Sequence, residues 1–181
     1  MTRIQPINEI TADAETTELL GLVKKKMGSV PNLISTMANS LSVIKAYLGF
    51  NQALSTGTLS PRLREQIALL VSETNNCEYC LAAHTVIGMG TGLSKQETMD
   101  ARRGTSRSDK ERVALEFTRQ IVLNHGIVTD NDIMQIRQAG YSDGEIAEIV
   151  ANIALNIFTN YFNLVAETEV DFEAAPGISV S

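Results

Sequence analysis

The chain has 181 residues, 44% of them hydrophobic and 20% charged, a composition typical of one soluble globular domain. Fifteen Lys and Arg residues against 21 Asp and Glu residues give a formal net charge of −6, which argues against a nucleic-acid partner. The first segment, MTRIQPINEI, lacks the apolar core of a signal peptide, and no apolar run near it would span a bilayer. We therefore expect a cytoplasmic protein with no membrane partner, where a stabilising disulfide would be unusual.

The first half of the chain predicts three helices before the cysteines. Residues 16–26 favour a helix that Gly28 ends, and Pro31 fits the first turn of a second helix that continues towards Leu48. Ser60 and Pro61 form a helix start, because the amide hydrogen that proline lacks is not used in the first turn. That third helix is expected to end at Asn75 and Asn76.

The second half carries clear helix-start motifs. Ser94, Ser108 and Ser142 each precede a glutamate by three residues, as in the capping box. Thr129 fits the cap of a shorter helix that stops at Gly140. The glycines of residues 88–92 follow a predicted helix rather than a strand, so they indicate a helix end and connector and not a nucleotide-binding turn. No stretch alternates as a strand would, and an all-α fold follows.

Four asparagines recur on one face of the last predicted helix, at Asn152, Asn156, Asn160 and Asn163. Asparagine is a poor helix former, so the stripe favours amides that pair across a helix or subunit contact. A solvated face is the alternative.

Both cysteines and one of the two histidines lie in NNCEYCLAAH, residues 75–84. An N-cap at Asn75 or Asn76 would place Cys77 and Cys80 in the first turn of a helix, where unpaired amides and the helix dipole favour thiolate. His84 falls on the same face and can exchange a proton near neutral pH.

Glu65 precedes Cys77 by twelve residues, within the apolar segment EQIALLV. A carboxylate in such a segment must reach a polar pocket to avoid a large desolvation cost. It then suits general acid–base catalysis.

The order of these residues, E-x11-C-x2-C-x3-H, resembles the AhpD-like alkylhydroperoxidases of the carboxymuconolactone decarboxylase superfamily. VPNLISTMANS before the motif and GYSDGEIAEIVANIALNIFTNYFN after it are also similar to the peroxidase-related branch. The resemblance implies an AhpD-like single-domain helical bundle over residues 28–166. Residues 1–27 would form a helical segment packed on this core, and residues 167–181 a C-terminal arm. It also implies a homo-oligomer, either a trimer or a hexamer.

The resemblance further implies a two-cysteine peroxidase in antioxidant defence. Cys80 would attack a hydroperoxide and become a sulfenic acid, Cys77 would close the disulfide, and Glu65 and His84 would relay protons. An external dithiol donor, of lipoyl or thioredoxin type, would regenerate the pair, with no bound metal, haem or flavin. Some members carry a histidine between the cysteines where this chain has Tyr79.

Several alternatives stay open at this point. The helix-end argument by itself favours Cys77, not Cys80, as the attacking thiol. Cys77, Cys80 and His84 could instead bind zinc, with Glu65 or water as the fourth ligand. The superfamily also includes decarboxylating lyases, although that chemistry needs no thiol pair. A non-enzymatic redox sensor would carry the same reactive residues.

Overall fold

A computed structural model describes residues 2–8 and 12–178, and within these ranges the chain is helical without a strand. The helices are α1 (Ala14–Met27), α2 (Asn32–Met37), α3 (Leu41–Ser55), α4 (Pro61–Thr74), α5 (Glu78–Gly90), α6 (Lys95–Arg102), α7 (Asp109–Leu123), α8 (Asp130–Gln138) and α9 (Asp143–Ala166). The all-α prediction is confirmed, with a single helical domain.

Capping side chains set most helix starts where the sequence places them. Ser94, Ser142 and Thr129 form full capping boxes, in which the third helical residue returns a bond to the cap. Ser108 also caps its helix, but Glu111 does not return the bond. Its carboxylate instead accepts hydrogen bonds from the Gln66 amide at 3.0 Å and from a neighbouring serine. The motif thus predicted the helix start correctly and the partner of Glu111 wrongly.

The predicted helix from Pro31 towards Leu48 is interrupted. α2 ends at Met37, and α3 begins after Ser40. Ser40 has an extended backbone, and its hydroxyl accepts the amide of Val43 at 3.4 Å. An N-cap hydrogen bond of this kind satisfies an amide that would otherwise lack a partner, so the apolar spacing alone concealed a helix boundary.

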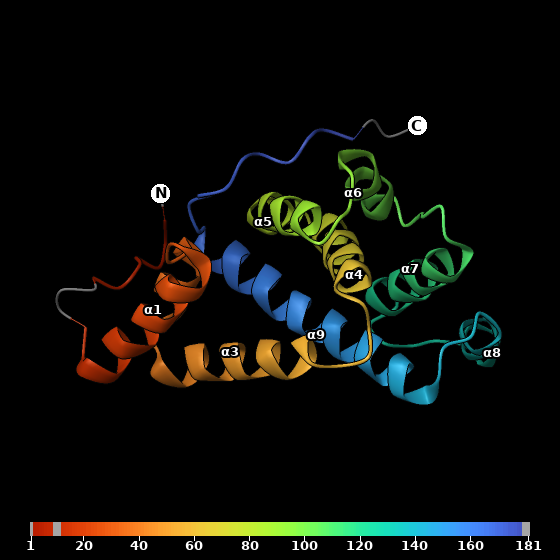
Figure 1. The fold of residues 1–181 in the computed structure, drawn as a ribbon, viewed down its shortest axis with the longest axis horizontal. Coiled ribbons are helices and arrows are strands. Elements are labelled where there is room, and N and C mark those ends of the chain that lie inside the picture. Colours follow the sequence, from red (N-terminus) through yellow and green to blue (C-terminus); the bar gives the residue numbers. More distant parts are fainter. Residues whose placement is uncertain (1, 9–11, 179–181) are drawn as a thin grey trace.

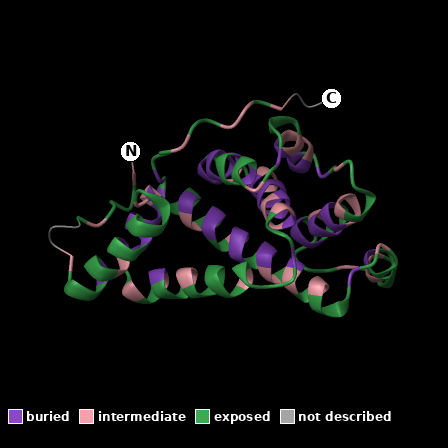
Figure 2. Cartoon of the chain, viewed as in Figure 1, coloured by how far each residue is buried: buried purple, intermediate pink, exposed green. Residues whose placement is uncertain are grey.

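Helix α4 occupies the middle of the bundle, where it contacts α5, α6, α7 and α9. In Figure 1, α9 runs between α3 on one side and α4 and α5 on the other. Figure 2 shows α4 and α9 with many buried residues, whereas α3 is largely exposed. Helices α4 and α5, which contact each other, are therefore fixed in place by their contacts with the rest of the bundle.

Two hydrophobic clusters build the interior. The larger one centres on α4, α7 and the first half of α9, and its fully buried side chains include Ile67, Leu69, Leu70, Leu115 and Ile149. The smaller one joins α1, α2 and α3 to the beginning of α5, and it contains Leu20, Val23, Leu33, Ile34, Met37, Ile44, Cys77, Tyr79, Cys80 and Ala83. The two cysteines are thus part of the smaller cluster.

Helix α9 has 24 residues and is long and apolar enough to cross a membrane by length and composition alone. Half of its most apolar window is buried inside this one chain, and the helix packs on α3, α4, α5 and α7. These contacts are those of the core helix of a bundle.

The chain after α9 begins near α1 and runs back over α5 towards α6, as the blue trace in Figure 1 shows. Asp171 accepts the backbone amide of Asn32 at 2.8 Å, and the ring of Phe172 meets Tyr79 edge-on at 5.7 Å between centroids. Further along, the carbonyl of Pro176 accepts a hydrogen bond from Arg102. The described part of the predicted arm, residues 167–178, therefore packs against α2, α5 and α6; residues 179–181 lie outside the description.

Glu97 on α6 links that helix to α4 through an ion pair with Arg62. The Ser94 amide first, then the Ser94 hydroxyl and Arg62, lower the pKa of Glu97 from 4.5 to about 2. A carboxyl group whose pKa is lower in the folded state stabilises the fold above the unfolded pKa and loses that contribution as pH falls through the folded pKa.

We therefore expect the free energy of unfolding to fall between about pH 4.5 and pH 2, and Glu97→Gln to remove part of that fall. Urea unfolding at a series of pH values measures the difference. Glu18→Gln, at an exposed position on α1, is the control. Equal pH dependence of the wild type and Glu97→Gln would contradict the expected role.

Candidate active site

The loop between α4 and α5 places the first cysteine at a helix start. Asn75 ends α4, and Asn76 has a positive φ of 54° that turns the chain. Cys77 itself is the N-cap of α5, and its sulfur accepts the backbone N–H of Cys80 at 3.4 Å. The prediction of an asparagine cap was wrong, because the Asn75 side chain instead donates to the Asn160 Oδ1 at 2.9 Å.

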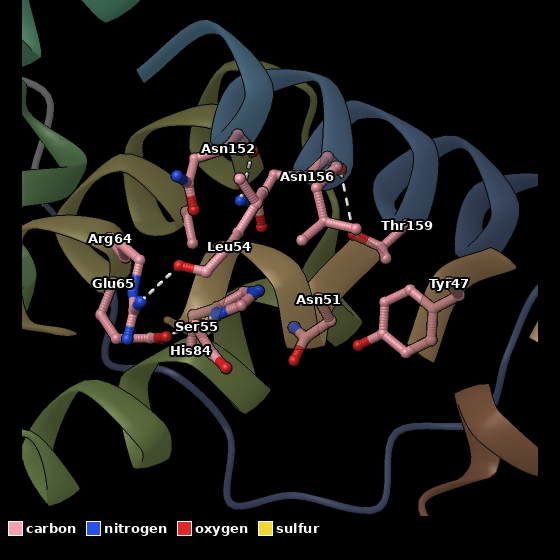
Figure 3. A pocket seen from close by; sticks show the side chains of 12 residues that line it. Tyr47, Asn51, Leu54, Ser55, Arg64, Glu65, His84, Asn152, Asn156 and Thr159 are labelled. Atoms are coloured by element: carbon pink, nitrogen blue, oxygen red, sulfur yellow. Dashed lines mark hydrogen bonds and ion pairs between the residues drawn. The ribbon is translucent and has the colours of Figure 1, made fainter. Parts of the chain in front are cut away.

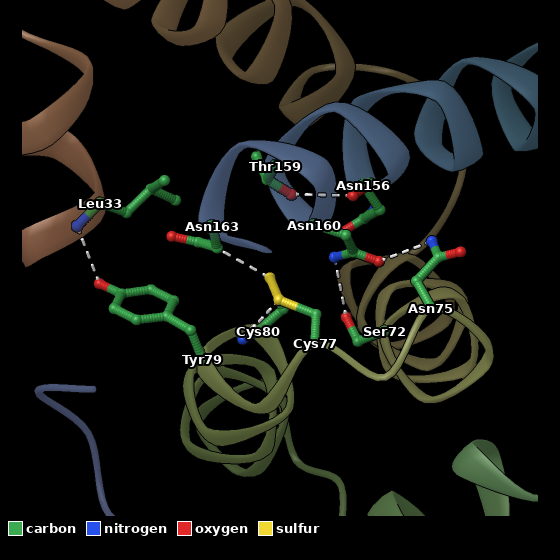
Figure 4. The surroundings of a disulfide bond; sticks show 10 residues. All are labelled: Leu33, Ser72, Asn75, Cys77, Tyr79, Cys80, Asn156, Thr159, Asn160 and Asn163. Carbon is green, nitrogen blue, oxygen red and sulfur yellow. Dashed lines mark hydrogen bonds between the residues drawn. A yellow bond between two sulfur atoms is a disulfide. The ribbon is translucent and has the colours of Figure 1, made fainter. Parts of the chain in front are cut away.

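Cys77 and Cys80 form a disulfide with a Cα–Cα distance of 5.3 Å, within the range in which disulfides occur. Both residues are buried, with 1% and 2% of their surface exposed. Figure 4 shows the pair at the beginning of α5, facing α9. The sequence predicted these two residues to lie close together, and they do.

Glu65 and His84 meet across the contact between α4 and α5. The Glu65 Oε2 and the His84 Nδ1 are 2.8 Å apart, and the two side chains are 16% and 20% exposed. A carboxylate on one imidazole nitrogen fixes the ring and leaves the other nitrogen to exchange a proton. Figure 3 shows the two side chains together at the edge of a pocket.

A cavity of about 300 Å³ connects these two pairs of residues. Cys80, Glu65 and His84 all line it, whereas Cys77 does not. Much of the remaining lining is apolar and comes from α1, the beginning of α2, α3, α5 and the C-terminal segment: Val23, Met27, Pro31, Leu33, Ile34, Leu48, Ile87 and Phe172. Three of the four predicted site residues thus share one cavity, and the fourth lies behind Cys80.

A second cavity of about 130 Å³ is also lined by the Glu65–His84 pair. It is more polar, and its walls include Arg64, Asn152 and Asn156. The residues common to both cavities are Tyr47, Asn51, Glu65, His84 and Thr159. Glu65 and His84 therefore line both the largely apolar cavity that contains Cys80 and the more polar one.

Tyr47 is a member of this site that the sequence did not indicate. Burial first, then the charge of Glu65, raises the pKa of Tyr47 to about 12. The hydroxyl therefore keeps its proton at neutral pH and serves as a hydrogen-bond donor within the cavity. Nothing in the segment around Tyr47 distinguishes it from an ordinary residue on the buried face of a helix.

The asparagine stripe of α9 is buried inside the chain, so the alternative of a solvated face is wrong. Asn152 and Asn156 donate to backbone carbonyls one turn earlier in α9. Asn160 donates to the Ser72 hydroxyl at 3.3 Å, and the Asn163 Nδ2 lies 3.2 Å from the Cys80 sulfur. The pairing of amides across a helix contact is confirmed for these last two residues.

Tyr79, between the two cysteines, makes contacts that join separate segments of the fold. Its hydroxyl accepts the backbone N–H of Leu33 at 3.1 Å, and its ring packs on Phe172. Burial raises the pKa of Tyr79 well above its usual range. The residue thereby ties α2 and the C-terminal segment to α5, and Phe172 enters the cavity wall from a part of the chain that carries no recognisable motif.

The zinc alternative requires Cys77, Cys80 and His84 to converge with a fourth ligand. Over residues 2–8 and 12–178, no group of three or more His, Cys, Asp or Glu side chains is placed to hold a metal ion. His125, the other histidine, lies at a helix terminus, just after α7, and has a positive φ.

Residues 42–120 match the sequence profile of the carboxymuconolactone decarboxylase family. This segment contains all four predicted site residues. The match supports, over this segment, the resemblance to the carboxymuconolactone decarboxylase superfamily. No curated protein sequence gives a significant match.

Solved structures show the same fold over nearly the whole chain. A peroxidase-related protein from Ralstonia eutropha JMP134, described as an alkylhydroperoxidase AhpD core, has a TM-score of 0.86 at 21% identity and covers 94% of this chain and 92% of its own. One from Silicibacter sp. TM1040 has a TM-score of 0.80 at 23% identity, with 92% and 91% covered. The debrominase Bmp8, solved with 2,3,4-tribromopyrrole, has a TM-score of 0.78 at 22% identity, with 94% and 92% covered.

Proposed function

We propose that this protein is a thiol-dependent peroxidase that reduces organic hydroperoxides. The observation that carries the proposal is that Cys80 lines an apolar cavity together with the hydrogen-bonded Glu65–His84 pair, while Cys77 lies directly behind it. The cavity would hold the organic part of the substrate. The reacting oxygen atoms would then lie between the sulfur and the acid–base pair.

The chemistry balances with these groups and one external dithiol. The Cys80 thiolate attacks one peroxide oxygen, so that an S–O bond forms, the O–O bond breaks, and the leaving alkoxide takes a proton from the Glu65–His84 pair to become the alcohol. The Cys77 thiolate then attacks the sulfenic acid of Cys80 and releases water as the disulfide forms. The dithiol donor returns two electrons and two protons to the pair.

The cavity also supports Cys80, rather than Cys77, as the attacking thiol. Cys80 is the cysteine that lines the cavity, and a substrate there approaches its sulfur first. The Cys77 sulfur accepts the N–H of Cys80 at the start of α5, an environment that favours a thiolate. That environment suits a resolving cysteine, which must attack the sulfenic acid and later leave as a thiolate.

The burial of the disulfide bears on the reductant. Cys80 is only 2% exposed, so a donor must insert its thiols through the cavity. A dithiol on a slender flexible arm, as in a lipoyl protein, meets this demand better than a thioredoxin-type domain, whose cysteines lie on a folded surface. We therefore propose a lipoyl-type donor, and no bound cofactor in the catalytic cycle.

A thiol count tests the peroxidase proposal directly. Fully reduced, metal-free protein should lose two thiols per chain with one equivalent of an organic hydroperoxide such as cumene hydroperoxide, and a dithiol should restore both. Continuous turnover with dihydrolipoamide would separate an enzyme from a redox sensor that reacts once. If both thiols survive the hydroperoxide, the proposal fails.

Reductive dehalogenation of an aromatic ring is a second candidate. The debrominase Bmp8 shares the fold, and Tyr47, Tyr79 and Phe172 give the cavity of this chain an aromatic lining. The thiolate would take the bromine, a proton would replace it on carbon, and the second thiol would displace bromide to form the disulfide. Bromide release from a bromopyrrole in the presence of a dithiol would establish this activity, and its absence beside peroxide turnover would reject it.

The decarboxylase alternative uses acid–base groups without the thiols. Under that mechanism, replacing both cysteines by serine would leave activity on a carboxymuconolactone unchanged. The position of Cys80 in the cavity wall favours a thiol mechanism instead.

Homo-oligomerisation as a trimer or hexamer stays a prediction, as does the cytoplasmic location. Large apolar side chains on the outer face of α9 support the oligomer, because they remain exposed in the single chain: Phe158, Tyr161, Leu164 and Val165. Light scattering of the purified protein measures the number of subunits.

A further inference from the structure

The proposed cycle needs two thiolates, and the helix start stabilises only one of them directly. The Cys77 sulfur takes the N-cap position and accepts the N–H of Cys80. Cys80 follows three residues later and donates its own amide to that bond. Its sulfur therefore needs a different hydrogen-bond donor if it is to react as a thiolate.

Asn163 on α9 supplies a donor at that sulfur. Its Nδ2 lies 3.2 Å from the Cys80 Sγ, and the side chain is 96% buried, since only 4% is exposed. Figure 4 shows Asn163 projecting from α9 towards Cys80. Asn163 lines neither of the two cavities described above, so it contacts the sulfur without standing in the place of a substrate.

The other end of the same amide is left without a partner. The Asn163 Oδ1 is buried and has no hydrogen bond among the described residues. An unsatisfied buried acceptor costs stability, and an apolar side chain of similar size would avoid that cost. The other asparagines of the stripe donate to backbone carbonyls or to a hydroxyl, whereas this one donates to the reactive sulfur.

We propose that Asn163 is a positioning residue for Cys80: its amide donates a hydrogen bond to the Cys80 thiolate in the reduced protein and holds that sulfur against the cavity. The inference rests on the proposed thiol chemistry. It assigns one donor to each sulfur, the backbone N–H of Cys80 to Cys77 and the side chain of Asn163 to Cys80.

Other ionisable groups surround Cys80 from the remaining elements. Those that line its cavity or contact its neighbours are Lys26 on α1, Tyr47 on α3, Glu65 on α4, Cys77, Tyr79 and His84 on α5, and Asp171 beside Tyr79. The Glu65 charge opposes a thiolate, and His84 is hydrogen-bonded to that carboxylate. Helix α9 brings no ionisable side chain to this cavity, which it lines with Thr159, so its influence on the Cys80 sulfur comes through the neutral amide of Asn163.

The test measures the pKa of the Cys80 thiol in Asn163→Leu, which is close in size to the wild type but lacks the donor. Reduced protein is treated with iodoacetamide across a pH series, and mass spectrometry follows alkylation of each cysteine separately. Loss of a hydrogen bond to a charged sulfur should raise the pKa of Cys80 by about one to two units. Peroxide reduction at pH 7 should slow by about tenfold or more for the same reason.

Asn160→Leu is the matched control, since it removes a buried amide one turn away that donates to Ser72 and not to a sulfur. It should lower the melting temperature and leave the Cys80 pKa unchanged. A second variant, Asn163→Ala, removes the donor without filling its space, and it should raise the Cys80 pKa as Asn163→Leu does.

The inference is overturned if either Asn163 variant folds and keeps the wild-type Cys80 pKa, or if Asn160→Leu shifts that pKa equally. Because alkylation needs no peroxide, this readout is independent of the proposed enzymatic activity. A shifted pKa in a protein that reduces no hydroperoxide would uphold the role of Asn163 and reject the peroxidase.

Discussion

Cys80→Ser is expected to abolish hydroperoxide turnover, with a loss of roughly 10³-fold or more that reaches the uncatalysed background. Serine is nearly isosteric with cysteine, but its hydroxyl stays protonated near neutral pH and cannot replace a thiolate as the nucleophile. Cys80 is buried at the beginning of α5, and serine fills nearly the same space there. Circular dichroism and thermal melting should therefore show a folded protein. Peroxide consumption coupled to dihydrolipoamide oxidation measures the activity.

Cys77→Ser is the matched variant, and it should behave differently. Cys80 still lines the cavity, so one equivalent of hydroperoxide should be consumed and a sulfenic acid should remain on Cys80, where dimedone traps it. Turnover then stops because no neighbouring thiol closes the disulfide. If Cys80→Ser instead shows the single turnover and Cys77→Ser shows none, the two roles are reversed.

Glu65→Gln is expected to lower the rate of peroxide reduction by about 10² to 10⁴-fold, the usual range for loss of a proton-transfer group. In the wild type, His84 lies 2.8 Å from the Glu65 carboxylate. Glutamine keeps the size of the side chain and a polar contact with His84, but it cannot carry the proton to the leaving alkoxide. The pH profile of kcat/KM should therefore change shape, which a merely structural defect would not produce.

Glu73→Gln is the control for this variant. Glu73 belongs to the same helix, but its carboxylate pairs with Arg102 at 2.7 Å and does not line either cavity. Its pH profile should match that of the wild type. A Glu65→Gln protein with the wild-type rate and profile would exclude Glu65 from proton transfer.

The elements that the sequence predicts well are those set by local chemistry. The caps at Ser60, Ser94, Thr129 and Ser142 begin helices where expected, because a side-chain oxygen satisfies nearby amides whatever the rest of the fold does. The spacing of Cys77, Cys80 and His84 likewise defines one face of a helix. For Glu65, the sequence indicated a polar pocket, and the structure supplies it in the contact with His84.

The parts that the sequence does not predict depend on contacts between distant segments. Asn75 is a good cap by itself, but it pairs with Asn160 on α9, 85 residues later, and leaves the cap position to Cys77. The cavity wall combines α1 and α2 with Phe172, which no local pattern can reveal. The asparagine stripe is visible in the sequence, but whether it faces solvent or the interior depends on how α9 packs against α4 and α5.

The disulfide joins residues only three positions apart, so it closes a very short loop. A cross-link stabilises a fold largely by restricting the unfolded chain, and the loop-entropy relation gives about 2 kcal/mol for so short a loop against about 4.7 kcal/mol for a loop of 100 residues. The fold therefore gains less than half as much from this bond as from one that closes a loop of 100 residues. The cysteines can therefore alternate between oxidised and reduced forms with a smaller change in the free energy of unfolding than a long-range disulfide would cause. Repeated cycles then alter the two sulfur atoms and leave the helical fold in place.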